Sequence, residues 1–183
     1  MKNKLLTYSP VLLWVTFVIG CFLFIESNFK YWYSFMEQYL MFQTTDLYFF
    51  NKLAEPGGLT QYVAEFLSIS FAYPMGASII LAVLLSGATA CFYLYLKKCG
   101  FKTSMLVAIL PGFLFWWFPQ ESITPLLTVL IVLGTAVAYA SVACKKVRYS
   151  IGLVLLTLTY FTSAPAPLLA AVLMGYLRMY PSQ

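Results

Sequence analysis

The sequence predicts an all-α membrane protein, a polytopic bundle of about six transmembrane helices with further helices in a long outer loop. Of its 183 residues, 62% are hydrophobic and only 9% are charged, whereas soluble domains average roughly a quarter charged residues. So few charged side chains cannot cover the surface that a domain of this length exposes to water, so that surface must face lipid. This composition excludes a soluble domain, a disordered chain and a disulfide scaffold. The +5 net charge lies in small clusters, so we expect no nucleic-acid partner.

Apolar runs separated by polar clusters give the expected spans. The spans are residues 9–25, 69–96, 103–118, 123–143, 149–164 and 166–178. A bilayer core needs about 20 helical residues, and the shorter runs approach this length by recruiting their neighbours. The last two runs are separated by Ser163-Ala164-Pro165-Ala166-Pro167, whose prolines disfavour a continuous helix. If the helix continued through this segment, the spans would number five.

The charged residues predict the orientation of these spans. With the N-terminus inside, nine of the eleven Lys and Arg residues fall on the inner side, and only Lys30 and Lys52 fall outside. All six acidic residues fall on the outer side. Because basic residues accumulate in short cytoplasmic loops, we expect a multi-pass inner-membrane protein with a cytoplasmic N-terminus. Residues 1–183 form a single membrane domain, in which residues 26–68 are the outer loop.

The beginning of the chain has a second interpretation. Lys2 and Lys4 precede an apolar run, and Val18-Ile19-Gly20-Cys21 resembles a lipoprotein cleavage box. The run continues apolar through residues 22–25, where a processed lipoprotein turns polar. We therefore expect an uncut first helix, with cleavage as the alternative. No cysteine lies in the outer loop, so we expect no disulfide.

The outer loop is densely aromatic, which is typical of helices at the headgroup level of a membrane. We expect interfacial helices at residues 30–43 and 46–54, the second capped by Thr45 or Asp46. The residues Pro56, Gly57 and Gly58 predict a turn after it. Residues 59–66 then lead into the second span.

If the protein has catalytic residues, we expect them in this loop, because the spans contain almost no ionisable side chains. The lack of ionisable residues in the spans also counts against a transporter coupled to protons or ions. Glu37 and Asp46 are the candidate general bases; the alternative is that they are solvated charges or helix caps. Glu55 and Glu65 are interpreted as ordinary loop charges. No Cys or His spacing typical of metal sites occurs, so no metal site is predicted, and the cofactor is unknown.

Further candidates are residues that would contact a substrate. Glu121 is the only acid outside the long loop and is expected to face the same cavity. Lys30 and Lys52 are suited to hold a phosphate or to lie near anionic headgroups. Trp116 is either a substrate platform or an interface anchor.

In this sequence a first span is followed by an outer loop with acidic residues and two interfacial helices, and then by a proline-glycine turn toward the second span. This arrangement resembles that of the GT-C superfamily of membrane glycosyltransferases. The matching residues are Glu37-Gln38, Asp46-Leu47-Tyr48-Phe49, Pro56-Gly57-Gly58-Leu59 and Tyr62. The resemblance implies a lipid-linked sugar as substrate and a catalytic Asp or Glu in this loop, which would be Glu37 or Asp46. The segments from Tyr48 to Tyr62 also resemble an uncharacterised family of bacterial multi-pass membrane proteins, which are generally longer. The chain is therefore expected to be the N-terminal part of a larger protein.

Two functions follow as expectations. One is a GT-C-like glycosyltransferase, or its N-terminal part, that uses a polyprenyl-phosphate-linked sugar. The other is a non-enzymatic membrane subunit or scaffold, whose aromatic outer loop docks another membrane protein or the missing C-terminal region. The second expectation rests on the absence of a complete catalytic set and on small-residue helix faces, such as Ala82, Ser86 and Ala90.

Overall fold

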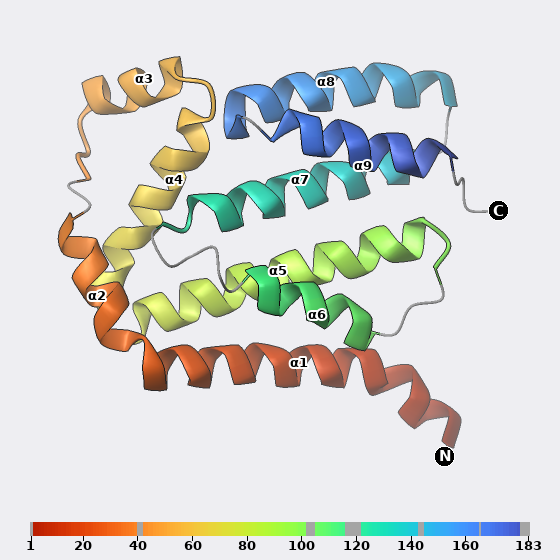
Figure 1. Cartoon of the computed structure of the whole chain (residues 1–183), viewed down its shortest axis with the longest axis horizontal. Coiled ribbons are helices and arrows are strands. Elements are labelled where there is room, and N and C mark those ends of the chain that lie inside the picture. The colour runs from red at the N-terminus through yellow and green to blue at the C-terminus, as the bar shows by residue number, and fades with distance from the viewer. Residues whose placement is uncertain are drawn as a thin grey trace.

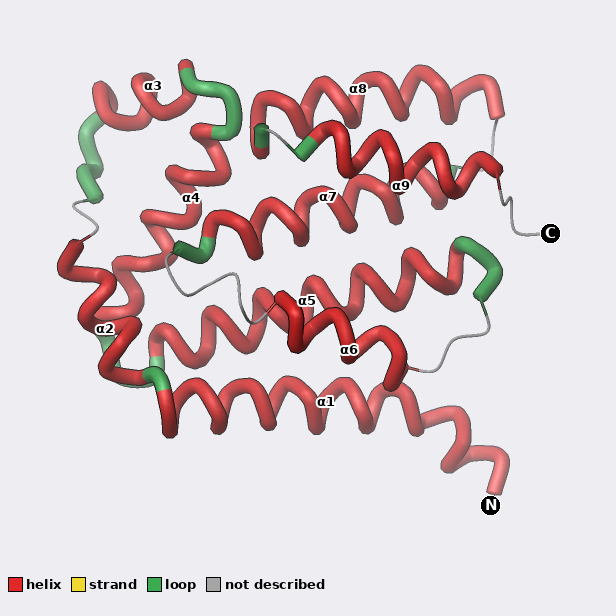
Figure 2. Tube along the Cα trace, in the orientation of Figure 1, coloured by secondary structure: helices red, strands yellow, loops and turns green. Residues whose placement is uncertain are grey.

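The fold is a bundle of helices with a further layer of helices at one end (Figure 1). The computed structural model describes residues 2–39, 42–101, 105–115, 122–142, 145–164 and 166–179. Every regular element within these ranges is a helix, which confirms the all-α class (Figure 2). The elements are α1 (Lys2–Asn28), α2 (Lys30–Tyr39), α3 (Asp46–Ala54), α4 (Gly58–Ser68), the 3-10 helix η1 (Ile69–Ala72), α5 (Gly76–Lys98), α6 (Met105–Phe115), α7 (Thr124–Ser141), α8 (Lys145–Ser163) and α9 (Pro167–Met179).

Helices α1 and α5 to α9 form the bundle and alternate in direction along the chain (Figure 1). Helix α5 is central and packs against α1, α6 and α7, while α8 and α9 pack against α7 and each other. Small buried side chains line α5 where α1 approaches, among them Ala82 and Ser86. The indole Nε1 of Trp14 donates to the Ser86 carbonyl oxygen across this contact at 3.2 Å. The small-residue face of α5 therefore allows close helix packing.

Three of the described helices are long and apolar enough to cross a membrane, namely α1 over Pro10–Asn28, α5 and α7. This number is below the predicted six. Helices α6 and α9 have 11 and 13 residues, which correspond to about 17 and 20 Å, short of the ~30 Å hydrocarbon core. Helix α8 begins with Lys145, Lys146 and Arg148, which shorten its apolar length.

Elements α2, α3, α4 and η1, residues 30–72, form what we call the end cap. Helices α2 and α4 run across the end of the bundle, and α3 packs on α4 (Figure 1). Helix α3 has the bounds expected from the sequence, and Thr45 is its N-cap, its hydroxyl accepting from the Tyr48 amide at 3.4 Å. Helix α2 is described over Lys30–Tyr39, and residues 42 and 43 are not helical, so the helix does not reach residue 43 as expected.

The path from the end cap into α5 differs from the expectation of one span from residue 69. Residues 58–68 form a helix of their own, and α5 begins only at Gly76. Between them the chain turns at Tyr73-Pro74-Met75-Gly76, where the Gly76 amide donates to the Tyr73 carbonyl oxygen at 3.0 Å. Proline at the second position favours such a turn. Residues 69–72, the 3-10 helix η1, therefore belong to the end cap and not to the second span.

A polar contact attaches the end cap to the end of α8. The Gly57 amide donates to the Phe161 carbonyl oxygen at 3.1 Å. The Thr60 hydroxyl donates to the Thr162 carbonyl oxygen, so the Ser163 hydroxyl, 2.6 Å away, donates to Thr60. Both hydroxyl side chains are buried, and the network satisfies them. We call this network the α4–α8 contact.

Candidate functional site

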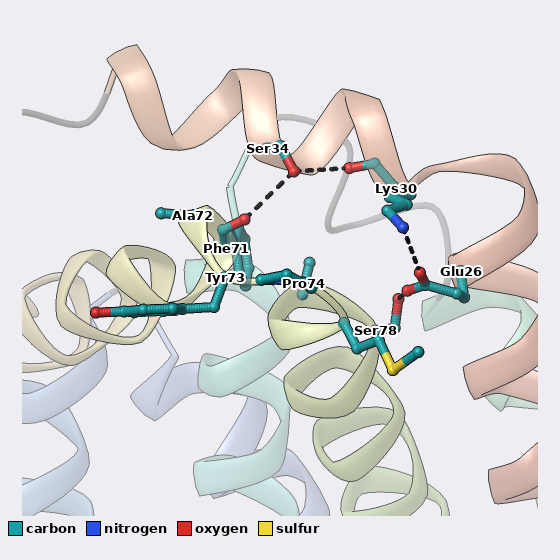
Figure 3. Close-up of a pocket in the computed structure, with 10 residues that line it drawn as sticks. Glu26, Lys30, Ser34, Phe71, Ala72, Tyr73, Pro74 and Ser78 are labelled. Carbon is teal, nitrogen blue, oxygen red and sulfur yellow. Dashed lines mark hydrogen bonds and ion pairs between the residues drawn. The ribbon is translucent and has the colours of Figure 1, made fainter.

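A polar pocket of about 200 Å³ lies where the end of α1, the start of α2 and the start of α5 meet (Figure 3). Glu26 and Lys30 supply its charged groups, Ser34 and Ser78 line it with hydroxyl side chains, and residues 71–75 and Ala77 complete the lining. Glu26 and Lys30 are four residues apart on consecutive helical turns, a spacing that brings their side chains together. The pocket thus contains one negative and one positive side chain, Glu26 and Lys30, at the junction of the bundle and the end cap.

An ion pair organises the pocket (Figure 3). The Lys30 ammonium lies 3.0 Å from Glu26 Oε1, and the Ser78 hydroxyl donates to Glu26 Oε2 at 2.7 Å. The Ser34 hydroxyl lies 3.1 Å from the Lys30 carbonyl oxygen and 3.3 Å from that of Phe71. Both oxygens of Glu26 are therefore engaged. The Lys30 side chain is 43% exposed, and an ammonium has three donors, so it is suited to hold a second anion.

The pocket also contains a strained residue. Met75 has φ 64° in the turn before α5, and it is the single non-glycine residue with positive φ in the described ranges. This left-handed conformation costs a residue with a side chain about 1–2 kcal/mol. Such strain persists where the surrounding structure holds it, and it clusters at ligand sites.

A second polar group, which we call the Glu65 cluster, joins α3 to α4 within the end cap. The Lys52 ammonium lies 2.9 Å from Glu65 Oε1, and the Gln61 amide donates to the same oxygen at 3.0 Å. The Tyr48 hydroxyl donates to Glu65 Oε2. The Lys52 and Glu65 side chains are only 18% and 12% exposed. Aromatic rings adjoin the cluster, including those of Phe42, Phe49 and Tyr62.

These contacts shift two pKa values in opposite directions. Burial raises the pKa of the Glu65 carboxyl, but the hydrogen bonds from Tyr48, Lys52 and Gln61 and the charge of Lys52 outweigh it, so the pKa lies below its ordinary value. Burial, followed by the hydrogen bond to Glu65, raises the pKa of Tyr48 to about 12. The cluster thus keeps Glu65 ionised and Tyr48 protonated, which makes Glu65 a poor proton acceptor.

The stability that this cluster provides is expected to depend on pH at both extremes. Because the pKa of Glu65 is lowered on folding, its contribution is present above the ordinary value of 4.5 and is lost as the pH falls through the folded value. Because the pKa of Tyr48 is raised, its contribution is present below 10 and is lost as the pH rises through about 12. Unfolding should be measured against pH for the wild type, Glu65→Gln and Tyr48→Phe. Parallel curves for the wild type and both variants would contradict the expectation.

The structure places the predicted site residues as follows. Asp46 is the first residue of α3 and is exposed. Lys52 is paired with Glu65. Pro56 and Gly57 form the turn between α3 and α4, and Gly58 begins α4. Glu37 lies on α2, but its side chain is outside the description, and Glu121 and Trp116 are outside the described residues.

The sequence prediction missed several residues of these two clusters. Glu65, interpreted as an ordinary loop charge, is instead the centre of the Glu65 cluster. Its spacing of four from Gln61 was a readable helical signal, but its pairing with Lys52 depends on the packing of α3 against α4. The ion pair of Glu26 and Lys30 could also have been predicted, because opposite charges four residues apart lie on the same face of a helix. Among the described residues, no group of three His, Cys, Asp or Glu side chains is placed to hold a metal ion.

The fold and its apolar helices define the class as an all-α helical bundle compatible with a membrane protein. Within that class, residues 4–182 match the family described as a family of unknown function, DUF6057, and the chain belongs to it. No curated protein and no solved structure matches the chain.

Proposed function

We propose that this chain is a multi-pass inner-membrane protein that crosses the bilayer six times, with the end cap outside. The described bundle helices, α1 and α5 to α9, alternate in direction, and their even number supports six crossings (Figure 1). Lys97 and Lys98 end α5, far from the end cap, and Lys145 begins α8 at that same far end. The acidic residues Asp46, Glu55 and Glu65 lie in the end cap, and this distribution favours a cytoplasmic far end.

We further propose that it is the N-terminal part of a GT-C-like glycosyltransferase that uses a polyprenyl-phosphate-linked sugar. One observation carries this proposal: a layer of helices bearing acids is inserted between the first long apolar helix and the return into α5, and it lies across one end of the bundle. This order of elements is the one on which the resemblance to the superfamily rests.

In the proposed reaction, a carboxylate of the end cap accepts a proton from the acceptor hydroxyl. The acceptor oxygen then bonds to the anomeric carbon of the sugar, and the bond from that carbon to the phosphate oxygen breaks, releasing polyprenyl phosphate. Asp46, exposed on α3, and Glu37 on α2 are the candidate bases. A cation stabilises the departing phosphate. Lys30 is the better candidate for that role than Lys52, since it is 43% exposed against 18%.

The test replaces Asp46 by Asn and Glu37 by Gln, each separately, in cells whose only copy of the protein is the variant. Loss of the general base is expected to slow consumption of the lipid-linked sugar by about 10²–10⁴-fold. The quantity measured is the lipid-linked sugar that accumulates in the membrane fraction. Glu55→Gln is the matched control, because Glu55 is an exposed acid of the same layer. Unchanged consumption in both Asp46→Asn and Glu37→Gln contradicts the proposed enzyme.

The rival proposal, a subunit whose end cap docks a partner, is favoured by the apolar side chains that this layer exposes. Leu47 is 72% exposed, Phe50 63% and Tyr31 85%. Exposed apolar patches mark protein or membrane interaction sites. Two further variants distinguish the proposals. If the end cap docks a partner, Leu47→Ser and Phe50→Ser abolish co-purification of a stoichiometric partner, whereas Asp46→Asn does not.

A further inference from the structure

A groove of about 290 Å³ lies where α7, α8 and α9 meet, toward the end of the bundle far from the end cap (Figure 1). Tyr139 lines it from α7, and side chains of α8 and α9 line the rest, among them Tyr149, Leu153, Leu156 and Met174. From residue 149 to residue 156 the groove follows α8 for about 10 Å. It therefore has tyrosines near the start of α8 and aliphatic side chains beyond them.

A cation is held beside this groove. Arg148 Cζ lies 5.8 Å from the centroid of the Tyr139 ring, which is part of the groove wall. Arg148 Nε donates to the Val142 carbonyl oxygen at 2.9 Å, and Nη2 donates to the same oxygen. The guanidinium is thus fixed against the protein instead of extending into water. It has five N–H donors, and with the described residues it forms two hydrogen bonds, so three donors remain for a ligand.

The positive charge at this end has no acidic residue near it in the sequence. Helix α8 begins with Lys145-Lys146-Val147-Arg148, and α7, α8 and α9 contain no Asp or Glu. The acids whose side chains the structure describes lie in α1 or the end cap, namely Glu26, Asp46, Glu55 and Glu65. A ligand that complements this end of the groove therefore carries a negative charge.

An anionic phospholipid matches both features of the groove. Its charge lies at one end and its aliphatic chains lie beyond, in the same order as the cation and the apolar wall. A membrane-spanning helix of another protein matches less well. In the orientation proposed above this end is cytoplasmic, and the cytoplasmic flanks of spanning helices are rich in Lys and Arg. Those residues would be repelled by the start of α8, whereas an anionic headgroup is attracted to it.

We propose that this groove binds a phospholipid whose headgroup has a net negative charge. The lipid phosphate accepts from the remaining N–H groups of Arg148, whose planar fork suits phosphate oxygens. One acyl chain lies along α8 from Tyr149 to Leu156. The groove covers about 10 Å of one leaflet, which is half of the ~30 Å hydrocarbon core. This site goes beyond the proposed function, and it exists whether or not the protein is an enzyme.

The experiment uses the purified full chain in detergent micelles with either phosphatidylglycerol or phosphatidylcholine, the two lipids having identical acyl chains. Native mass spectrometry measures the lipid that stays bound at each concentration. We expect phosphatidylglycerol to bind about tenfold more tightly than phosphatidylcholine, a difference of ~1.4 kcal/mol. Equal binding of the two lipids overturns the proposal. Micelles have no sides, so the result is independent of the orientation of the chain in the cell.

Arg148→Gln is expected to abolish the preference for phosphatidylglycerol. Lys97→Gln is the matched control, because Lys97 is an exposed cation in the last turn of α5, at the same end of the bundle. We expect this control to keep the preference. An equal loss in both variants would mean that diffuse surface charge attracts the lipid, which overturns a site at Arg148.

Gly175→Phe tests whether the acyl chain lies in the groove. Gly175 lines the groove, and an added Cβ meets nothing within 4 Å, so a larger side chain enters the open space. We expect about tenfold weaker binding of phosphatidylglycerol. Gly134→Phe on α7 is the control, since its Cβ also meets nothing within 4 Å and Gly134 does not line the groove. Undiminished binding to Gly175→Phe overturns the proposal, and so does a dimer of the chain whose formation releases the lipid.

Discussion

Replacing Gly58 by alanine is expected to lower the free energy of unfolding by about 3 kcal/mol, the upper part of the usual range for overpacking. A Cβ at this position would lie 1.7 Å from the Lys52 carbonyl oxygen, a backbone atom that cannot rotate away. That oxygen also accepts from the Glu55 amide at 3.1 Å, so displacing it breaks the end of α3.

The damage is expected to extend to the α4–α8 contact. Gly57, with φ 83°, precedes Gly58, and a Cβ there would lie 2.9 Å from the Ala164 amide nitrogen. This close approach is what allows the Gly57 amide to reach Phe161 and the Thr60 hydroxyl to reach Thr162. Moving the turn to accommodate alanine at Gly58 therefore separates the end cap from α8.

Unfolding of Gly58→Ala by sodium dodecyl sulfate in mixed micelles, followed by circular dichroism, measures the loss. Gly20→Ala is the control, because its Cβ meets nothing within 4 Å. Alanine in the interior of a helix is expected to be more favourable than glycine by about 0.5–1 kcal/mol. Equal stability of Gly58→Ala and the wild type would contradict the close approach of Gly58 to the Lys52 carbonyl oxygen.

Replacing Glu65 by glutamine is expected to cost about 2–3 kcal/mol of folding stability, because it removes a charged hydrogen-bond acceptor from three donors. The Lys52 ammonium, whose side chain is 18% exposed, then loses its partner at 2.9 Å. Removing one partner of a mostly buried ion pair is more costly than removing both. Lys52→Met together with Glu65→Leu is therefore expected to be more stable than the sum of the single changes predicts.

A double-mutant cycle over Lys52 and Glu65 measures this coupling, which we expect to be about 1–3 kcal/mol. Glu55→Gln serves as the control and should change stability by less than about 0.5 kcal/mol, since Glu55 is exposed. A coupling energy near zero would mean that the ion pair does not hold α3 to α4.

The class of the protein and the position of α3 were predictable because their signals are local. Composition separates a lipid-facing bundle from a soluble domain, and Thr45 before Asp46 marks the start of a helix. Helix α4 was missed because residues 59–66, which mix polar and apolar side chains, were interpreted as the approach to the second expected span. Pro74 and Gly76 favour the turn before α5, but the positive φ of Met75 between them could not be predicted, because residues with a side chain rarely adopt it.

The clusters at Glu26 and Glu65 were less predictable, because each has partners from other elements. Glu26 meets Ser78, 52 residues later, and Thr60 meets Ser163, 103 residues later. No helical periodicity relates residues so far apart. The pairing of Lys52 with Glu65 likewise follows from the turn at Gly57 and Gly58, which folds α4 back onto α3.

The proposed placement of the end cap outside the membrane is tested most directly by cysteine labelling in intact cells. In a variant without native cysteines, Asn51→Cys places a thiol at an exposed position of α3, and Lys98→Cys places one at the far end of α5. A membrane-impermeant maleimide is expected to label Asn51→Cys without permeabilisation and Lys98→Cys only after it. Labelling of Lys98→Cys in intact cells, with Asn51→Cys protected, would contradict the orientation on which the proposed function depends.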